Sequence, residues 1–362
     1  METTSRPLRV CLLTGGGDAP GSNAAIRAFV HAATHRSILV VASRFGFEGL
    51  LGREQVIPLR IEDVRGILAR GGCILGSSRV DPFSLPAGTV ALDATAKLQV
   101  RLSDLGVDAL VFAGGDGTMH IAEHLTKLGV RCVAIPKTID GDVGGTEQTV
   151  GLDTAVQTAT SAIDALHATA EAHQRVMIVE VMGRHAGWIA LRAGIASGAD
   201  AVLIPEIPYD PGRVLAKIRE RESLGLRFSI VVVGEGARPL GGTPSEVEPA
   251  GPGRPARLGG AGERVSQELA SRRVGHDVRV TVLGHLQRGG IPTASDRLLA
   301  TRFGAHAAEL CAQRRFGRMV MLRNGYIDSI PIDESVRAPG RIDTVGELVR
   351  CARAMGIELG AS

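Results

Sequence analysis

The fold is decided first by residues 8–30, LRVCLLTGGGDAPGSNAAIRAFV, in which an apolar strand runs into three glycines and then into a helical pattern. Residues 109–125, ALVFAGGDGTMHIAEHL, follow the same order of strand, glycine loop and helix. At such a junction, free backbone N–H groups and the positive end of the helix dipole can bind an anion. Either loop alone could be only a tight turn, but two together, one of them carrying an acid, favour a phosphate site.

Other short apolar runs extend this pattern along the chain. They lie at 8–13, 38–42, 109–113, 132–135, 176–181, 201–204, 229–233 and 278–283. Runs of this length, apolar on both faces and separated by helical patterns, predict parallel strands buried between helices. The predicted fold class is therefore α/β, and a length of 362 residues suggests two domains. Residues 241–262 are rich in Gly and Pro without periodicity and predict a long surface loop.

The composition is that of an ordinary globular protein and argues against several classes. Apolar residues make up 44%, and 41 Lys and Arg against 38 Asp and Glu leave a net charge of +3. Aromatic residues, at 3%, are too few for a nucleic-acid stacking platform. No apolar run approaches the ~18 residues of a membrane span. Five widely spaced cysteines without a C-x-x-C pair predict a reduced protein of the cytoplasm.

Acidic residues in two of the loops point to phosphoryl chemistry. A carboxylate beside a phosphate would be repulsive unless a cation lay between them, so Asp116 is interpreted as a Mg²⁺ ligand; the alternative is a turn or cap residue. The segment VAIPKTIDGDV at 133–143 places Asp140 and Asp142 two residues apart, after Lys137 and Thr138. One carboxylate could take a proton from a substrate hydroxyl while the other serves the metal. An Asx-rich turn is the alternative for this segment.

With these motifs the chain resembles the phosphofructokinase A family. The motifs that carry the resemblance run in order along nearly the whole chain: GGGDAPGSNAAIR at 15–27, GGCILGSSR at 71–79, GGDGT at 114–118, PKTIDGD at 136–142, EVMGRHAGW at 180–188, GEG at 234–236 and RVTVLGHLQRGG at 279–290. GGDGT is shared with other kinase families, whereas VLGHLQRGG is highly specific. The combination of motifs identifies the family.

The resemblance implies two Rossmann-like parallel-sheet domains with the active site in the cleft between them. It implies a large domain at 1–150 plus about 287–337, holding the donor and Mg²⁺, and a small domain at about 151–286 plus 338–362, holding the sugar phosphate. The reaction implied is transfer of the γ-phosphoryl group of ATP to the 1-hydroxyl of fructose 6-phosphate, a step of glycolysis. The partners implied are these two substrates and further copies of the chain, as a dimer or tetramer, with no nucleic acid or membrane.

The site residues are implied by matching positions. The nucleotide and phosphate site is implied at Gly16, Phe47, Arg79, Gly117 and Thr118, with Asp116 on the metal. The catalytic set is Lys137, Thr138, Asp140 and Arg184, with Asp140 as the base and Arg184 steadying charge on the transferred group. The acceptor site is Thr138, Asp140, Asp142, Arg175, Met182, Gly183, Arg184, Glu235, Arg279, His285 and Arg288. In the family, the two arginines matching Arg175 and Arg279 come from a neighbouring subunit.

Different residues of the sequence favour different phosphoryl donors. Family members that use pyrophosphate usually carry an aspartate at the position of Gly117, and its carboxylate would repel the α-phosphate of a nucleotide. Lys137, however, is the residue with which those enzymes pair pyrophosphate, and Ile121 would crowd an adenine. In addition, Gly141 replaces the asparagine of the family's usual TIDND. We expect ATP as donor, with pyrophosphate as the alternative.

The sequence fits two other functions less well. A catalytically silent sensor of sugar phosphate or nucleotide is disfavoured because Asp116, Asp140 and Arg184 are all present. An NAD-dependent oxidoreductase would require G-x-G-x-x-G with an acid roughly 20 residues further on, which GGGDAPG does not match.

Overall fold

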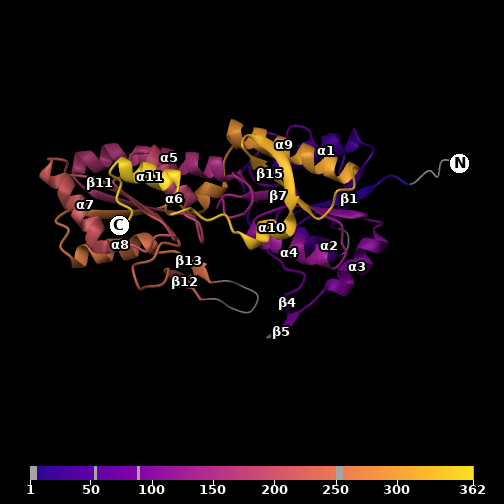
Figure 1. The fold of residues 1–362 in the computed structure, drawn as a ribbon, viewed down its shortest axis with the longest axis horizontal. Coiled ribbons are helices and arrows are strands. Elements are labelled where there is room, and N and C mark those ends of the chain that lie inside the picture. The colour runs from indigo at the N-terminus through magenta and orange to yellow at the C-terminus, as the bar shows by residue number, and fades with distance from the viewer. Residues whose placement is uncertain (1–5, 53–54, 88–89, 250–255, 362) are drawn as a thin grey trace. The chain divides into compact units, whose positions relative to one another are not determined.

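The computed structural model describes residues 6–52, 55–87, 90–249 and 256–361, which form two compact units. The first unit comprises residues 1–153 and 288–340, and the second comprises residues 154–287 and 341–362. In each unit helices pack against a largely parallel sheet (Figure 1). The predicted α/β class is confirmed.

The first unit is built on a sheet with the strand order β16-β15-β7-β6-β1-β2-β3. The strands are β1 (Arg9–Thr14), β2 (Leu39–Ser43), β3 (Val56–Pro58), β6 (Ala109–Gly114), β7 (Cys132–Thr138), β15 (Arg318–Arg323) and β16 (Tyr326–Pro331), and β8 (Val150–Gly151) pairs with the end of β7. The central strands are parallel, as predicted. The edge strands β3 and β16, which the sequence analysis missed, run antiparallel to β2 and β15.

Helices cover both faces of this sheet. α1 (Ser22–Thr34) and α9 (Ala294–Ala312) lie side by side on one face (Figure 1). α2 (Gly46–Leu51), α3 (Thr95–Asp104), α4 (Asp116–Lys127) and α10 (Ile332–Arg337) cover the other face. Val10 and Leu12 of β1 pack toward α1 and α9, while Cys11 and Leu13 pack toward the opposite helices, because side chains alternate along a strand. A 3-10 turn at Glu62–Val64 and the hairpin of β4 (Leu85–Ala87) and β5 (Val90–Leu92) complete the unit.

The second unit has a parallel sheet with the order β10-β11-β9-β14. Its strands are β9 (Val176–Val181), β10 (Ala201–Leu203), β11 (Ser229–Gly234) and β14 (Val278–Val282). α7 (Pro211–Ser223) and α8 (Ala261–Ser271) pack on one face. α6 (Trp188–Ala196) covers the other face with α5 (Leu152–His173) and α11 (Glu347–Ala354) (Figure 1).

The prediction of a long loop at 241–262 is wrong in part. β12 (Glu246–Glu248) and β13 (Arg257–Leu258) form an antiparallel pair within this segment, and α8 already begins at Ala261. Residues 250–255 of the predicted loop lie outside the described residues.

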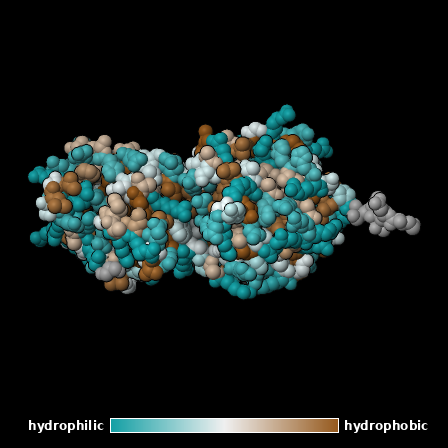
Figure 2. All heavy atoms as spheres, turned by 45° about the horizontal axis from the view of Figure 1, so that its top comes forward, coloured by the Kyte–Doolittle hydropathy of each residue, from teal (hydrophilic) through white to brown (hydrophobic). Residues whose placement is uncertain are grey.

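Among the described residues, no helix is long and apolar enough to cross a membrane. On the face shown in Figure 2, hydrophilic residues predominate and apolar residues are scattered, as is usual for protein surfaces.

Candidate functional site

The two glycine loops of the first unit follow neighbouring parallel strands. β1 and β6 pair from Val10 with Ala109 to Thr14 with Ala113, so the loops after them leave the same edge of the sheet. From β1 the chain first adds β2 on one side and later adds β6 on the other. The direction of strand addition therefore reverses between β1 and β6, and ligands of open α/β sheets bind outside the carboxyl ends of strands at such a switch point.

Thr118 shows how closely these loops approach each other. It lies in the first turn of α4 and is 4% exposed. A Cβ built on Gly15 would lie 2.5 Å from Thr118 Oγ1, and one on Gly114 would lie closer still. Glycine is therefore required on both sides of this hydroxyl. The N–H of Gly16 donates to the carbonyl oxygen of Ser78 at 3.0 Å, which brings a third segment to the same place.

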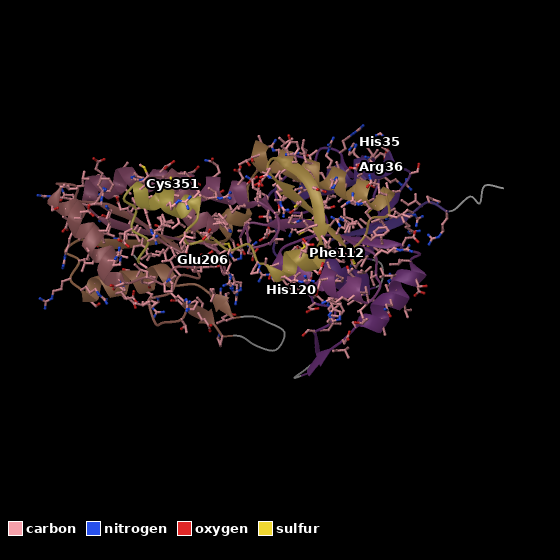
Figure 3. All side chains as sticks on the ribbon, in the orientation of Figure 1. His35, Arg36, Phe112, His120, Glu206 and Cys351 are labelled. Carbon is pink, nitrogen blue, oxygen red and sulfur yellow. The ribbon has the colours of Figure 1, made fainter. Side chains whose placement is uncertain are left out.

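Asp116 is the first residue of α4, where the helix dipole favours a negative charge. The carboxylate is partly exposed, and Asp116 Oδ1 lies 3.7 Å from Nε2 of His120, one helical turn further along α4. His120 is labelled in Figure 3. Gly117 is exposed, and a Cβ built on it would meet nothing within 4 Å. The start of α4 thus offers an acid beside open space.

The loop after β7 holds the two further aspartates. The N–H of Asp140 donates to Thr138 Oγ1 at 3.1 Å, and the N–H of Gly340 donates to the carbonyl oxygen of Asp142 at 2.9 Å. Gly141 between them has φ +68°, a left-handed conformation that glycine and asparagine adopt most readily. Glycine and the asparagine of TIDND therefore both suit this backbone conformation.

The electrostatics of this loop fit a bound cation. Burial, together with repulsion from Asp140 and Asp116, raises the pKa of Asp142 to about 7. Asp142 Oδ1 is buried and has no hydrogen-bond partner among the described residues. Within those residues no group of three His, Cys, Asp or Glu side chains is arranged to hold a metal. Mg²⁺ does not require such a group, because it usually binds through one or two carboxylates, water and substrate phosphates.

The side chains of Lys137 and Arg288 bind backbone oxygens of the first glycine loop and of Asp18, which follows it. Lys137 is 1% exposed, and its Nζ donates to the carbonyl oxygens of Gly15 at 2.9 Å and Gly17 at 2.5 Å. Arg288, also buried, donates from Nη1 to the carbonyl oxygen of Asp18 at 3.1 Å. Both side chains therefore bind backbone of the predicted phosphate loop.

Two predicted nucleotide contacts differ in exposure. Arg79 is exposed. Phe47 is buried in the core, where its ring lies 5.7 Å from that of Phe112, a core residue shown in Figure 3. The neighbouring Phe45 is the exposed ring of this segment. A contact between Phe47 and an adenine stays a prediction, and the burial of its ring argues against it.

The second unit gathers its predicted residues at the carboxyl ends of three strands. Met182, Gly183 and Arg184 follow β9, Glu235 follows β11 and His285 follows β14. Gly183 has φ +138°, and Arg184 Nη1 donates to the carbonyl oxygen of Ala256 at 2.7 Å. These strands pair in parallel through β9, so the loops after them share one edge of the sheet.

Arg175 and Arg279 lie at the other end of these strands. Arg175 immediately precedes β9, and Arg279 is the second residue of β14. A strand of this length spans about 20 Å, so within one chain these arginines are far from Met182 and His285. Both are held by Asp277, which pairs with Arg175 Nε at 3.0 Å and with Arg279 Nη1 at 2.8 Å.

Sequence reasoning missed several residues that shape these loops. Ser77 Oγ donates to the carbonyl oxygen of Gly16 at 2.7 Å. Gln287, fully buried, accepts from the N–H of Met182 at 3.3 Å and donates to the carbonyl oxygen of Gly284 at 3.1 Å. Asp277 was missed as the partner of two arginines. Small polar residues inside glycine-flanked motifs, GSSR and HLQRGG, were the available signal for the first two.

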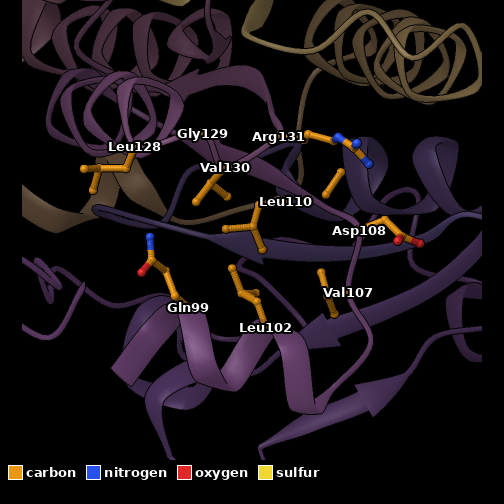
Figure 4. A pocket seen from close by; sticks show the side chains of 10 residues that line it. Gln99, Leu102, Val107, Asp108, Leu110, Leu128, Gly129, Val130 and Arg131 are labelled. Carbon is orange, nitrogen blue, oxygen red and sulfur yellow. The ribbon is translucent and has the colours of Figure 1, made fainter. Parts of the chain in front are cut away.

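A cavity of about 390 Å³ opens at the opposite edge of the first sheet (Figure 4). It is lined at the starts of β6 and β7 by side chains that include Leu102, Val107, Leu110 and Val130. None of the predicted site residues lines this cavity.

The chain is similar to several named proteins. Residues 9–311 match the family model described as Phosphofructokinase. ATP-dependent 6-phosphofructokinase of Chloroflexus aggregans is 47% identical over 358 residues, which cover 98% of this chain and 99% of that protein. Pyrophosphate–fructose 6-phosphate 1-phosphotransferase of Amycolatopsis methanolica is 47% identical over 332 residues, covering 91% and 94% of the two proteins. A solved phosphofructokinase of Saccharomyces cerevisiae superposes with a TM-score of 0.76 at 32% identity, over 91% of this chain and 45% of that longer chain.

Proposed function

The chain belongs to the phosphofructokinase family, and we propose that it is an ATP-dependent 6-phosphofructokinase of the cytoplasm, which phosphorylates the 1-hydroxyl of fructose 6-phosphate in glycolysis. The observation that carries this proposal is the convergence of the Gly15–Gly17 and Gly114–Gly117 loops around Thr118, beside Asp116. An anion cradle next to an acid at a helix start suits a phosphate bound with a divalent cation.

The chemistry required is mainly positioning and neutralisation of charge. Asp140 would accept the proton of the sugar hydroxyl, with Thr138 Oγ1 fixing the backbone N–H of Asp140. Asp116 would hold Mg²⁺, directly or through water, with Asp142 close to it. The ion would supply positive charge against the donor phosphates. Arg184 would bind the transferring phosphoryl group, because a guanidinium presents a fork of donors to phosphate oxygens.

The sugar phosphate would be held mainly by residues of the second unit. Met182, Gly183 and Glu235 would contact the sugar, and His285 and Arg288 would contact its 6-phosphate. Arg175 and Arg279 would complete the phosphate clamp of a neighbouring copy, since they lie at the far ends of β9 and β14 in their own chain. This arrangement requires a homo-oligomer, a dimer or tetramer.

The donor is the point at which relatives of equal identity differ. The Chloroflexus aggregans protein is named as ATP-dependent and the Amycolatopsis methanolica protein as pyrophosphate-dependent, and each is 47% identical to this chain. Gly117 favours ATP here, because the space beside it is open for a nucleotide. We expect kcat/KM with ATP to exceed kcat/KM with pyrophosphate in a coupled assay of fructose 1,6-bisphosphate formation.

Gly117→Asp tests this assignment of the donor. Because the added side chain meets nothing within 4 Å at its Cβ, the variant should fold, and its carboxylate should reduce ATP use by at least about tenfold more than pyrophosphate use. Gly117→Ala is the matched control, which adds the Cβ without the charge. Ready turnover of pyrophosphate and none of ATP by the unmodified enzyme would favour the pyrophosphate-dependent alternative. Absence of turnover with either donor, despite binding, would favour the silent sensor.

A further inference from the structure

The turn at Gly15–Asp18 has an unusual arrangement of its backbone carbonyls. All four carbonyl oxygens accept hydrogen bonds from side chains: those of Gly15 and Gly17 from Lys137, that of Gly16 from Ser77 and that of Asp18 from Arg288. No regular secondary structure satisfies these acceptors. Three side chains from three separate segments do so instead.

The orientation of the carbonyls fixes that of the N–H groups. In a trans peptide the C=O and the N–H of the next residue point in opposite directions. Binding of the Gly15 and Gly17 oxygens to Lys137 therefore turns the N–H groups of Gly16 and Asp18 away from Lys137. The N–H of Gly16 already donates to the carbonyl oxygen of Ser78, so of these two groups the N–H of Asp18 is the one that can meet an anion. A phosphate is attracted by N–H groups and repelled by carbonyl oxygens, so this arrangement favours an anion on the side away from Lys137.

The ammonium group of Lys137 is enclosed by protein. Lys137 is 1% exposed, with two of its three N–H donors bound to backbone oxygens. Burial, with a smaller contribution from Arg288 and against the opposing effects of Cys73 and Asp18, lowers the pKa of Lys137 to about 8. A side chain committed in this way is poorly placed to meet a donor phosphate directly.

We propose that Lys137 is a positioning residue of the donor site, which holds carbonyl oxygens of the Gly15–Gly17 loop away from the donor phosphates and does not select between ATP and pyrophosphate. The inference rests on the proposed function, because it takes this loop as the donor-binding loop. It assigns the choice of donor to other residues, such as Gly117.

Lys137→Met tests the inference, because methionine fills a similar volume without the donors. We expect the KM for ATP to rise at least about tenfold, while the KM for fructose 6-phosphate stays within about twofold. The Kd of ATP and the Kd of pyrophosphate, measured by calorimetry, should rise by similar factors. Lys127→Met, on the exposed face of α4, is the matched control and should leave these constants unchanged.

Three results would overturn the inference. A rise in Kd for pyrophosphate alone would show direct pairing of Lys137 with that donor. A lower melting temperature with unchanged Kd values would show a merely structural role. An equal rise in the KM for ATP and the KM for fructose 6-phosphate would show general damage to the site. By contrast, failure of the proposed function would appear in the unmodified enzyme, as absence of phosphorylated product.

Ser77→Ala keeps the inference testable if Lys137→Met does not fold. It removes the donor to the Gly16 oxygen, the acceptor that lies between the two bound by Lys137. We expect the Kd of ATP and that of pyrophosphate to rise by similar factors, roughly threefold to tenfold, since this hydrogen bond is uncharged. Unchanged affinity for both donors in this folded variant would contradict the role given to the carbonyls.

Discussion

At the scale of single residues, Asp140 is the group on which the proposed chemistry depends. Asp140→Asn keeps the size and the backbone hydrogen bond to Thr138 but cannot accept the proton of the sugar hydroxyl. We expect kcat to fall by about 100-fold or more, because a positioned base typically contributes that much. The KM for fructose 6-phosphate should change little. Steady-state kinetics with both substrates varied measure the two quantities.

The control for this variant is Asp104→Asn, which makes the same change on the exposed end of α3. It should turn over at the unmodified rate. If Asp140→Asn keeps near-normal turnover, Asp140 has no role as the base.

The sequence identified the positions of chemical groups better than the directions of their side chains. Asp116 and Thr138 lie at strand or helix ends, where pattern alone predicts them. Lys137 was expected in a loop after a strand ending at Ile135, but β7 continues to Thr138 through pairing of Lys137 with Val150. Inside a strand the side chain must point to one face of the sheet, and that of Lys137 points to the Gly15–Gly17 loop. Such long-range pairing leaves no local signal.

At the scale of elements, the loop after β7 depends on the end of α10. A Cβ built on Gly144 would collide with the carbonyl oxygen of Ala338 and would lie 2.7 Å from that of Ser335. Gly144→Ala should therefore displace the loop that carries Asp140 and Asp142. We expect a loss of about 1–3 kcal/mol in the free energy of unfolding, measured with urea, and a fall in kcat.

Gly117→Ala provides the comparison for this substitution, because its added Cβ meets nothing within 4 Å. It should unfold at the same urea concentration as the unmodified protein. Equal stability and equal kcat in Gly144→Ala would show that the loop does not depend on this packing.

The elements that the sequence predicted are those whose burial leaves a strong pattern. The strands β1, β2, β6, β7, β9, β10 and β11 are apolar and largely buried, and each was predicted to within a few residues. β15 and the edge strand β16 were missed, although Asn324 and Gly325 between them have φ +51° and +79°. Asn-Gly at such angles is typical of a tight hairpin turn, so a signal was present. β3 has three residues, two of them only partly buried, and offers no comparable pattern.

At the scale of the whole molecule, the position of two arginines bears on assembly. Arg175 and Arg279 share Asp277 at the starts of β9 and β14, whereas Met182, Glu235 and His285 lie beyond the carboxyl ends of β9, β11 and β14. Arg175 and Met182 are separated by the roughly 20 Å length of β9, which a rearrangement of side chains does not span. If all these residues bind one sugar phosphate, they must come from two copies of the chain.

Hybrid assemblies test this directly. Arg175→Ala and Asp140→Asn should each inactivate their own homo-oligomer. When the two variants are mixed, dissociated and reassociated, some sites should combine Asp140 of an Arg175→Ala chain with Arg175 of an Asp140→Asn chain. Because such a site is intact, activity should reappear in proportion to the fraction of hybrids determined by native mass spectrometry. Inactive hybrids, at a mass that proves their formation, would place Arg175 and Asp140 of the same chain in one site and contradict assembly of the site from two copies.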